Sequence, residues 1–238
     1  MASLESGAAT LPELARVPWR DRTSEATLRR DSRRWTACTA AHTLPHLATA
    51  GALAALNPLT VPLGAILLGH AWVVPELYAA RGAKVTRVTG RPEAKAARVT
   101  GRPGTQAEAV ALGLLGDLLD HRARELHARS GLALEPGRFG AWLLGPSGAI
   151  LVRPGGRIVH CYCVRVTEAQ LPPSDRTAHL LLALREDEAG FATLANLVFA
   201  GVTWRLRRRL AGSARSALEE AVRQARAIQP AGPGDDSR

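Results

Sequence analysis

Three histidines in an uncharged part of the chain are the residues with the most evident chemical potential. His42 and His46 are four positions apart, and His70 follows in the same segment. Histidines at positions i and i+4 share one face of a helix and can hold a transition metal. Ionisable groups inside a membrane often serve a function, so we take His42, His46 and His70 as candidate metal ligands. A hydrogen bond between helices, or a place at a membrane interface, also explains them.

The pair of histidines resembles one of the histidine boxes of membrane di-iron hydroxylases and desaturases. That resemblance implies a small membrane enzyme with a His-ligated metal, which we keep as an alternative function. Those families use several such boxes, whereas this chain has seven histidines in all. Pro45 also falls inside the pair. If Thr43 caps a helix with Pro45 in its first turn, His42 lies outside that helix.

The other candidate groups are better explained by structure than by catalysis. Cys161 and Cys163 share one face of an expected strand, whereas His160 points to the other face. Two side chains on one face are fewer than the about four ligands that a zinc site needs. Ser147 in Gly-Pro-Ser-Gly lacks the strand-turn-helix context of a nucleophile elbow. A solvated helix face accounts for four more residues, Asp117, Asp120, His121 and His127. We therefore predict no catalytic residue and no cofactor.

The stretch Trp-Leu-Leu-Gly-Pro-Ser-Gly-Ala-Ile-Leu-Val at residues 142–152 looks like the start of the nuclease-related domain family. The resemblance implies a nuclease with a carboxylate-bound Mg²⁺. The corresponding positions here read Arg138-Phe139-Gly140-Ala141 and Val152-Arg153-Pro154. Because they contain none of the carboxylates that would hold the metal, nuclease activity is not expected.

The uncharged segment predicts where the protein resides. From Trp35 to Pro75 it contains no Asp, Glu, Lys or Arg, and Asn57-Pro58 near its middle is a turn signal. A membrane-spanning helix needs about 20 mostly apolar residues. Trp35 to Asn57 and Leu59 to Tyr78 each supply that length, so we expect a two-helix transmembrane hairpin within residues 35–80. A buried helical hairpin of a soluble protein is the alternative.

Small residues spaced by four let two membrane helices approach closely. The hairpin offers three such pairs, which are Ala48 and Ala52, Gly51 and Ala55, and Ala65 and Gly69.

The charge distribution predicts orientation. The net charge is +10, of which residues 81–103 carry +6 and residues 1–34 carry +2. Basic residues beside membrane segments mark the cytoplasmic side, so we expect both termini in the cytoplasm and two spans of the cell membrane. The residues expected at the membrane interface are Trp35, Trp72, Tyr78, Arg81 and Lys84. The same charge would suit nucleic acid, but the basic residues lack interleaved aromatics.

The rest of the chain predicts a charged tail (1–34), a basic linker (81–105), a cytosolic α+β domain (106–229) and a disordered tail (230–238). The linker repeats Arg-Val-Thr-Gly-Arg-Pro at 87–92 and 98–103. The domain is expected to contain a small antiparallel sheet of about four strands with flanking helices. Its expected elements are a helix from Gln106 to Arg129, strands at Ala141–Gly145, Ala149–Arg153, Arg157–Val166 and Ala178–Arg185, a long helix from Asp187 to Leu210, and a last helix from Ser216.

The arginines near residue 210 form the remaining candidate site. A basic patch of Arg205, Arg207, Arg208 and Arg209 could contact anionic lipid or an acidic partner, or simply end a helix. Together these patterns predict an integral membrane protein whose cytosolic domain works by binding, as a regulatory or scaffold module. The lipid bilayer is the expected partner. The sequence leaves open whether the domain has a protein partner and whether the chain forms a homo-oligomer, and it disfavours nucleic acid as a partner.

Overall fold

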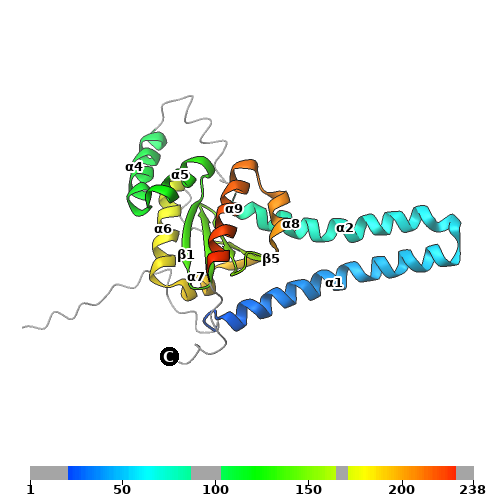
Figure 1. Ribbon diagram of the computed structural model, residues 1–238. Helices are drawn as coiled ribbons and strands as arrows, with labels where there is room; N and C mark the ends of the chain where they lie inside the picture. The colour runs from blue at the N-terminus through cyan, green and yellow to red at the C-terminus, as the bar shows by residue number, and fades with distance from the viewer. Residues whose placement is uncertain (1–20, 87–102, 165–170, 229–238) are drawn as a thin grey trace, which may run out of the picture.

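The computed structural model describes residues 21–86, 103–164 and 171–228, with side chains from 106 onward in the second range (Figure 1). Most of the predicted N-terminal tail, the repeated hexapeptides apart from the last residue of the second copy, and the predicted C-terminal tail lie outside these ranges. The described elements are, in order, α1 (Glu25–Leu56), η2 (Pro58–Thr60), α2 (Val61–Ala83), η3 (Lys84–Thr86), α4 (Pro103–Leu118), α5 (His121–Ser130), β1 (Ala133–Gly137), β2 (Gly140–Gly145), β3 (Gly148–Val152), β4 (Ile158–Cys163), α6 (Pro173–Glu186), α7 (Glu188–Leu194), β5 (Asn196–Val202), α8 (Thr203–Arg209) and α9 (Gly212–Ala227).

The five strands form one antiparallel sheet in the order β1-β2-β3-β4-β5. Glycines make its tight turns. Gly140 and Gly148 have φ values of +145° and +155°, and a Cβ on either would lie 2.1 Å from a backbone oxygen of the neighbouring strand. Only glycine fits such a close approach of two strands. The chain is therefore mostly helical with a five-stranded antiparallel sheet and flanking helices, as the sequence predicted in outline.

Helices cover both faces of the sheet (Figure 1). On one face the core combines α9, the end of α2 and α8, and its buried side chains include Ala83, Leu143, Ile150, Leu206 and Leu218. The other face packs against α4, α6, α7 and the start of α1, and its buried side chains include Leu28, Leu115, Trp142, Leu151 and Leu181. The two helices of the hairpin therefore contribute to the domain core before they leave it.

The N-terminal boundary of the hairpin differs from the prediction. We expected a charged tail as far as residue 34 and a helix start near Thr43. Instead α1 begins at Glu25, where the Ser24 hydroxyl accepts a hydrogen bond from the Thr27 N–H at 3.2 Å. The helix then continues through Pro45. Its first turn is held by the domain, because Leu28 is fully buried there.

The elements between residues 103 and 137 also differ from the prediction. The expected helix from Gln106 to Arg129 is broken after Leu118, because the Asp120 carboxylate accepts from the Ala123 N–H at 2.7 Å and starts α5. Strand β1 was not predicted. It contains Glu135 and Pro136, which are unfavourable in strands. These two residues are tolerated because β1 lies at the edge of the sheet.

The predictions for residues 178–210 were wrong in type. Ala178–Arg185 is part of helix α6 and not a strand, since a short leucine run has no period that separates the two. The expected helix from Asp187 to Leu210 is divided into α7, β5 and α8. Strand β5 pairs with β4 from Ile158 to Cys163 and supplies the fifth strand. The last helix, α9, begins at Gly212 and not at Ser216.

A buried histidine joins α1 to the sheet. His160 on β4 is fully buried, and its Nε2 lies 3.1 Å from both the Leu28 carbonyl oxygen and the Ser32 hydroxyl. A carbonyl only accepts, so Nε2 carries the proton, and Nδ1 has no hydrogen-bond partner among the described residues. Burial lowers the pKa of His160 to about 4; the bond to Leu28 opposes this and the nearby Arg153 adds to it. The imidazole is therefore neutral at pH 7.

This histidine predicts a specific acid sensitivity. As the pH falls from about 6.5 to about 4, the unfolded chain binds a proton that the folded chain excludes, so the free energy of unfolding decreases by up to roughly 3 kcal/mol. Unfolding of the full chain in detergent micelles at pH 7.5 and 4.5 measures it. His160→Asn should flatten the pH dependence, whereas His121→Asn, on an exposed side chain, should not. Identical pH slopes for the wild type and His160→Asn would contradict this account.

Candidate functional site

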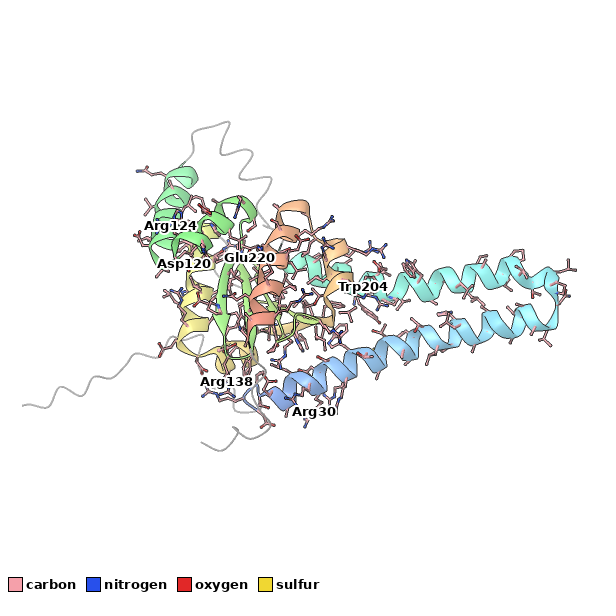
Figure 2. The ribbon with its side chains drawn as sticks, in the orientation of Figure 1. Arg30, Asp120, Arg124, Arg138, Trp204 and Glu220 are labelled. Atoms are coloured by element: carbon pink, nitrogen blue, oxygen red, sulfur yellow. The ribbon has the colours of Figure 1, made fainter. Side chains whose placement is uncertain are left out.

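The part of the chain from Thr36 to Leu77, here called the hairpin arm, extends beyond the domain with no other element beside most of its length (Figures 1 and 2). Eleven large apolar side chains on it are exposed, against seven in the much longer described remainder. Those on the arm are Leu44, Leu47, Leu56, Leu59, Val61, Leu63, Ile66, Leu68, Trp72, Val73 and Leu77. Water-soluble monomers rarely expose contiguous apolar surface on this scale.

One helix of the described residues, Pro58–Thr86, is long and apolar enough to cross a membrane. Only 17 % of its most apolar window is buried inside the structure, whereas the core helix of a soluble protein would be mostly buried. The expectation of two such helices is met by one, because α1 does not reach this level of apolarity. The part of α1 that belongs to the arm is uncharged, but it contains His42, His46 and several threonines and alanines, which lower its apolar character.

The two helices of the arm meet at small residues, although not at the predicted pairs. Ala50 and Gly64 are buried at the seam, where a Cβ on Gly64 would lie 3.5 Å from the Ala50 carbonyl oxygen. A Cβ on Gly51 or Gly69 would meet nothing within 4 Å. The predicted pairs that contain these two glycines therefore do not form the contact between α1 and α2.

Aromatic rings form the base of the arm. Trp35 contacts Tyr78 edge-on with ring centroids 5.6 Å apart, and Phe199 of β5 lies 6.0 Å from Trp35. Gly82 allows this packing, because a Cβ there would lie 2.8 Å from the Phe199 side chain. From Trp35 to Leu56 the helix rises about 32 Å at 1.5 Å per residue. That length is close to the ~30 Å hydrocarbon core of a bilayer.

Helix α8 places the predicted basic patch beside this base. The Arg208 guanidinium lies 5.7 Å from the Trp72 ring and 6.0 Å from the Trp204 ring, and Arg205 lies 5.2 Å from Trp204. Trp72 and Trp204 are 60 % and 48 % exposed. Exposed tryptophans next to arginines are typical of membrane–water interfaces. The structure thus joins the predicted interface residue Trp72 to the predicted basic patch.

A buried ion pair fastens α8 to α2. Glu76 is 4 % exposed, and Arg209 donates to its Oε2 from Nε at 2.7 Å. Arg208 is 4.0 Å from the other carboxylate oxygen. Arg207 is paired differently, with the exposed Glu219 on α9 at 2.9 Å. Glu76 is therefore a structural contact at the base of the arm.

The other two predicted interface residues lie past the base. The Arg81 guanidinium is 5.9 Å from the Tyr78 ring, and its side chain is exposed. Lys84 is exposed between Ala83 and Val85, which are both buried in the domain core. Both cations therefore lie where α2 enters the domain.

The structure separates the three candidate metal ligands. The rings of His46 and His70 face each other across the arm with centroids 5.9 Å apart, whereas His42 packs against Tyr78 at 6.2 Å. Nδ1 of His42 lies 2.7 Å from the Cys38 carbonyl oxygen, and Nδ1 of His70 lies 3.0 Å from the Ile66 carbonyl oxygen. Across the described ranges, no group of three or more His, Cys, Asp or Glu residues is placed to hold a metal ion.

The remaining candidates take part in ordinary structural contacts. Cys161 is buried in the core, and burial raises the pKa of its thiol. Asp120 caps α5. Burial lowers the pKa of His127, against the opposing charge of Glu108. Ser147 lies in the turn between β2 and β3, where its carbonyl oxygen accepts from the Val164 N–H.

Sequence reasoning did not identify the polar groups that hold the domain together. The Glu188 carboxylate accepts from the N–H groups of Arg138 and Phe139 at 2.6 and 2.9 Å and from Trp142 Nε1 at 2.6 Å. Arg153 pairs with Glu25 and donates to the Phe139 carbonyl oxygen at 2.7 Å. These partners are far apart in the chain, so no local pattern indicates them.

No known protein family, curated protein or solved structure matches this chain.

The ion pair at the base predicts that neutralising Glu76 and neutralising Glu219 will lower the stability by different amounts. Glu76→Gln removes the charge that faces Arg209 in a buried place, and we expect it to lower the free energy of unfolding by about 1–3 kcal/mol. The matched variant Glu219→Gln breaks an exposed pair and should cost less than about 1 kcal/mol. Denaturant unfolding in detergent compares the two. Equal effects would show that Glu76 does not fasten the arm to the domain.

Proposed function

We propose that this chain is an integral membrane protein in which the hairpin arm lies in the bilayer and the α+β domain rests on its cytoplasmic face. The domain acts as a binding module with a regulatory or scaffold role at the membrane. The observation that carries the proposal is the cluster of eleven exposed large apolar side chains on the arm, which contains no Asp, Glu, Lys or Arg before Glu76 at its base. Transferring them from water to hydrocarbon is favourable by on the order of 10 kcal/mol.

The base of the arm supports the same placement. Trp35, Trp72 and Tyr78 sit where the arm meets the domain, with Arg205 and Arg208 close by. Arginine side chains can extend to the headgroup region while their stems stay in apolar surroundings. Basic residues on this side favour a cytoplasmic domain, and a hairpin returns both termini to that side.

The buried polar groups of the domain support a binding role, because each of them makes a structural contact. His160 bonds to α1, Glu188 holds the β1–β2 turn, and Glu76 pairs with Arg209. Each of these groups has a structural partner that accounts for it. A scaffold fixed at the membrane surface is the function that fits such a domain.

A His-ligated metal enzyme is the second candidate, and the 5.9 Å approach of His46 and His70 favours it. Metal analysis of the purified full chain tests it. Bound zinc or iron that is lost in His46→Ala and His70→Ala would support the enzyme, and metal-free protein would leave the binding module.

Insertion should depend on the apolar character of the arm. Ile66 is 58 % exposed on the part of α2 that lies in the arm, and an arginine at the centre of a membrane-spanning helix costs about 2.5–3.5 kcal/mol. We expect Ile66→Arg to shift the chain from the alkaline-carbonate-resistant pellet to the soluble or aggregated fraction. Leu182→Arg, at a 43 % exposed leucine of the domain, should leave the protein in the pellet. If carbonate releases the wild-type chain as well, the membrane proposal is wrong and nucleic-acid binding by the basic residues becomes the next candidate.

The tip of the arm should reach the far side of the membrane. In a chain whose three cysteines are replaced by alanine, Asn57→Cys should react with a membrane-impermeant maleimide added outside intact cells. Ser213→Cys, in the first turn of α9, should react only after the cells are opened. Labelling of both positions from outside, or of neither position before the cells are opened, would contradict a two-span hairpin.

A further inference from the structure

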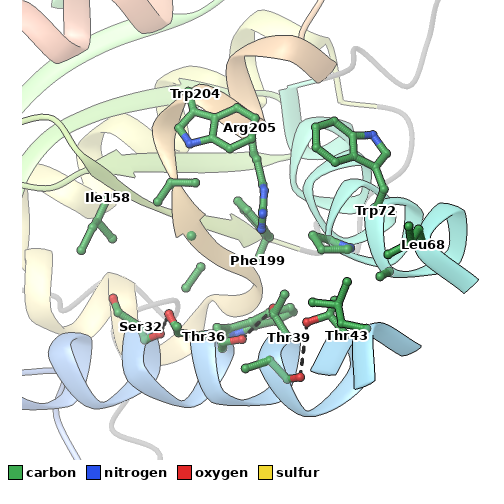
Figure 3. Close-up of a pocket in the computed structure, with 18 residues that line it drawn as sticks. Ser32, Thr36, Thr39, Thr43, Leu68, Trp72, Ile158, Phe199, Trp204 and Arg205 are labelled. Atoms are coloured by element: carbon green, nitrogen blue, oxygen red, sulfur yellow. Dashed lines mark hydrogen bonds between the residues drawn. The ribbon is translucent and has the colours of Figure 1, made fainter. Parts of the chain in front are cut away.

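A cavity of about 760 Å³ lies where the arm leaves the domain, between α1, α2, β4, β5 and α8 (Figure 3). Its lining extends from Ser32 near the sheet to Leu47 on α1 and Leu68 on α2. Leu47 is about 18 Å beyond Trp35 along the helix at 1.5 Å per residue. If the arm is in the bilayer, one end of the cavity lies among acyl chains and the other lies against the domain.

The walls of the cavity change in polarity along its length. Apolar side chains from the arm, Leu47, Leu68 and Trp72, line the membrane end, and Phe199 lies further in. A row of hydroxyls on α1 faces the cavity along one side (Figure 3), formed by Ser32, Thr36, Thr39 and Thr43. This arrangement fits an amphiphile better than a fully polar or fully apolar molecule.

The hydroxyls present acceptors to the cavity. Thr36 donates to the Ser32 carbonyl oxygen at 2.9 Å, and Thr39 donates to the Trp35 carbonyl oxygen at 2.8 Å. Their protons are therefore used within α1, and the oxygen lone pairs stay available. Pro75, which also lines the cavity, has no N–H to donate to the Ala71 carbonyl. The wall can thus receive hydrogen bonds from the hydroxyls of a ligand.

Arg205 provides the cationic group. It points from α8 toward α1 across the cavity (Figure 3) and is half-buried. Its guanidinium stacks on Trp204 at 5.2 Å, and among the described residues no carboxylate lies within 4 Å of it. Its neighbours differ, because Arg207 pairs with Glu219 and Arg209 pairs with Glu76. A half-buried guanidinium with five N–H donors and no carboxylate suits a phosphate.

The domain end of the cavity is also basic. A neighbouring cavity of about 330 Å³ shares Ser32 and Ile158 with it. Four arginines line this second cavity, which are Arg29, Arg33, Arg138 and Arg153, together with one acid, Glu25. The positive potential therefore increases from the membrane end toward the domain, in the direction that an anionic headgroup would point.

From these observations we propose that the cavity binds one anionic phospholipid of the bilayer, with its phosphate on Arg205 and its acyl chains along Leu47, Leu68 and Trp72. The volume falls within the about 300–1,000 Å³ usual for small-molecule sites, enough for the headgroup and the upper chains while the chain ends stay in the membrane. Glycerol hydroxyls of the headgroup donate to the threonine oxygens. This inference rests on the proposed function, because it requires the arm to be in the bilayer.

Native mass spectrometry of the full chain in detergent, titrated with phosphatidylglycerol or phosphatidylcholine, tests the site. We expect one phosphatidylglycerol to be retained at least tenfold more tightly than phosphatidylcholine. Arg205→Gln should reduce that preference at least fivefold, and Arg205→Lys should keep part of it. Arg207→Gln removes the same charge from the same helix outside this cavity and should leave the preference unchanged. Glycerol 3-phosphate without acyl chains should not displace the lipid.

Equal retention of the two lipids, or an equal loss of preference in Arg205→Gln and Arg207→Gln, would overturn the site. Displacement by glycerol 3-phosphate at comparable concentration would also overturn it, because the apolar end would then contribute nothing. Unchanged melting of both variants shows that they are folded. Carbonate resistance of the wild type is measured separately, so loss of lipid preference with retained resistance rejects the site and leaves the membrane proposal standing.

Discussion

Packing of the hairpin base into the core of the α+β domain determines how the arm leaves the molecule. Leu28 at the start of α1 is buried on one face of the sheet, while Ala79 and Ala83 at the end of α2 are buried on the other. The two helices that form the arm are thus also core helices of the domain. Because their bases cannot rotate without opening that core, the arm is held in one direction, unlike an anchor attached through a tether.

The same two helices meet two different environments along their length. At the base, the Trp35 ring and the backbone at Gly82 pack against Phe199. Beyond it, eleven large apolar side chains of the arm are exposed in the part of the chain that the structure describes. Helix α8 lies where the environments change. Its Arg209 pairs with Glu76 and holds the base, whereas its Arg205 faces the cavity. A membrane at this level would solvate the arm and leave the base unchanged.

The features that the sequence predicted are those with a local cause. The uncharged segment, the turn at Asn57 and the hairpin turns around Gly148 each follow from residues that are neighbours in the chain. The missed features depend on distant partners. Residues 187–210 have a helical period, yet β5 is a strand because β4 offers a hydrogen-bonding edge to it. The leucine run of α6 satisfies either period, and only its packing on the sheet decides between them.

The candidate site at the base of the arm could likewise be predicted only where its cause is local in the sequence. Trp35, Trp72 and Tyr78 were expected at a membrane interface, whereas the arginines of α8 were expected to contact anionic lipid, to contact an acidic partner or simply to end a helix. Their convergence at one base was not predicted, since Glu76 and Arg209 are 133 positions apart. His160 was noted only for the face it occupies. Its bond to Leu28 spans 132 positions, and no spacing in the sequence indicates it. Long-range contacts of this kind also form the cavity, which is lined from five separate elements.

The central claim is that hydrocarbon surrounds the arm. Nitroxide labels placed one at a time at Leu44, Ile66 and Leu182, in full-length protein reconstituted into liposomes, measure this through collisions with oxygen and with a water-soluble nickel complex. Our account predicts that Leu44 and Ile66 favour oxygen strongly over nickel, whereas Leu182 on the domain favours nickel. Free access of nickel to all three positions, or exclusion of both reagents from Leu44 and Ile66, would place the arm in water or in a protein interface and contradict it.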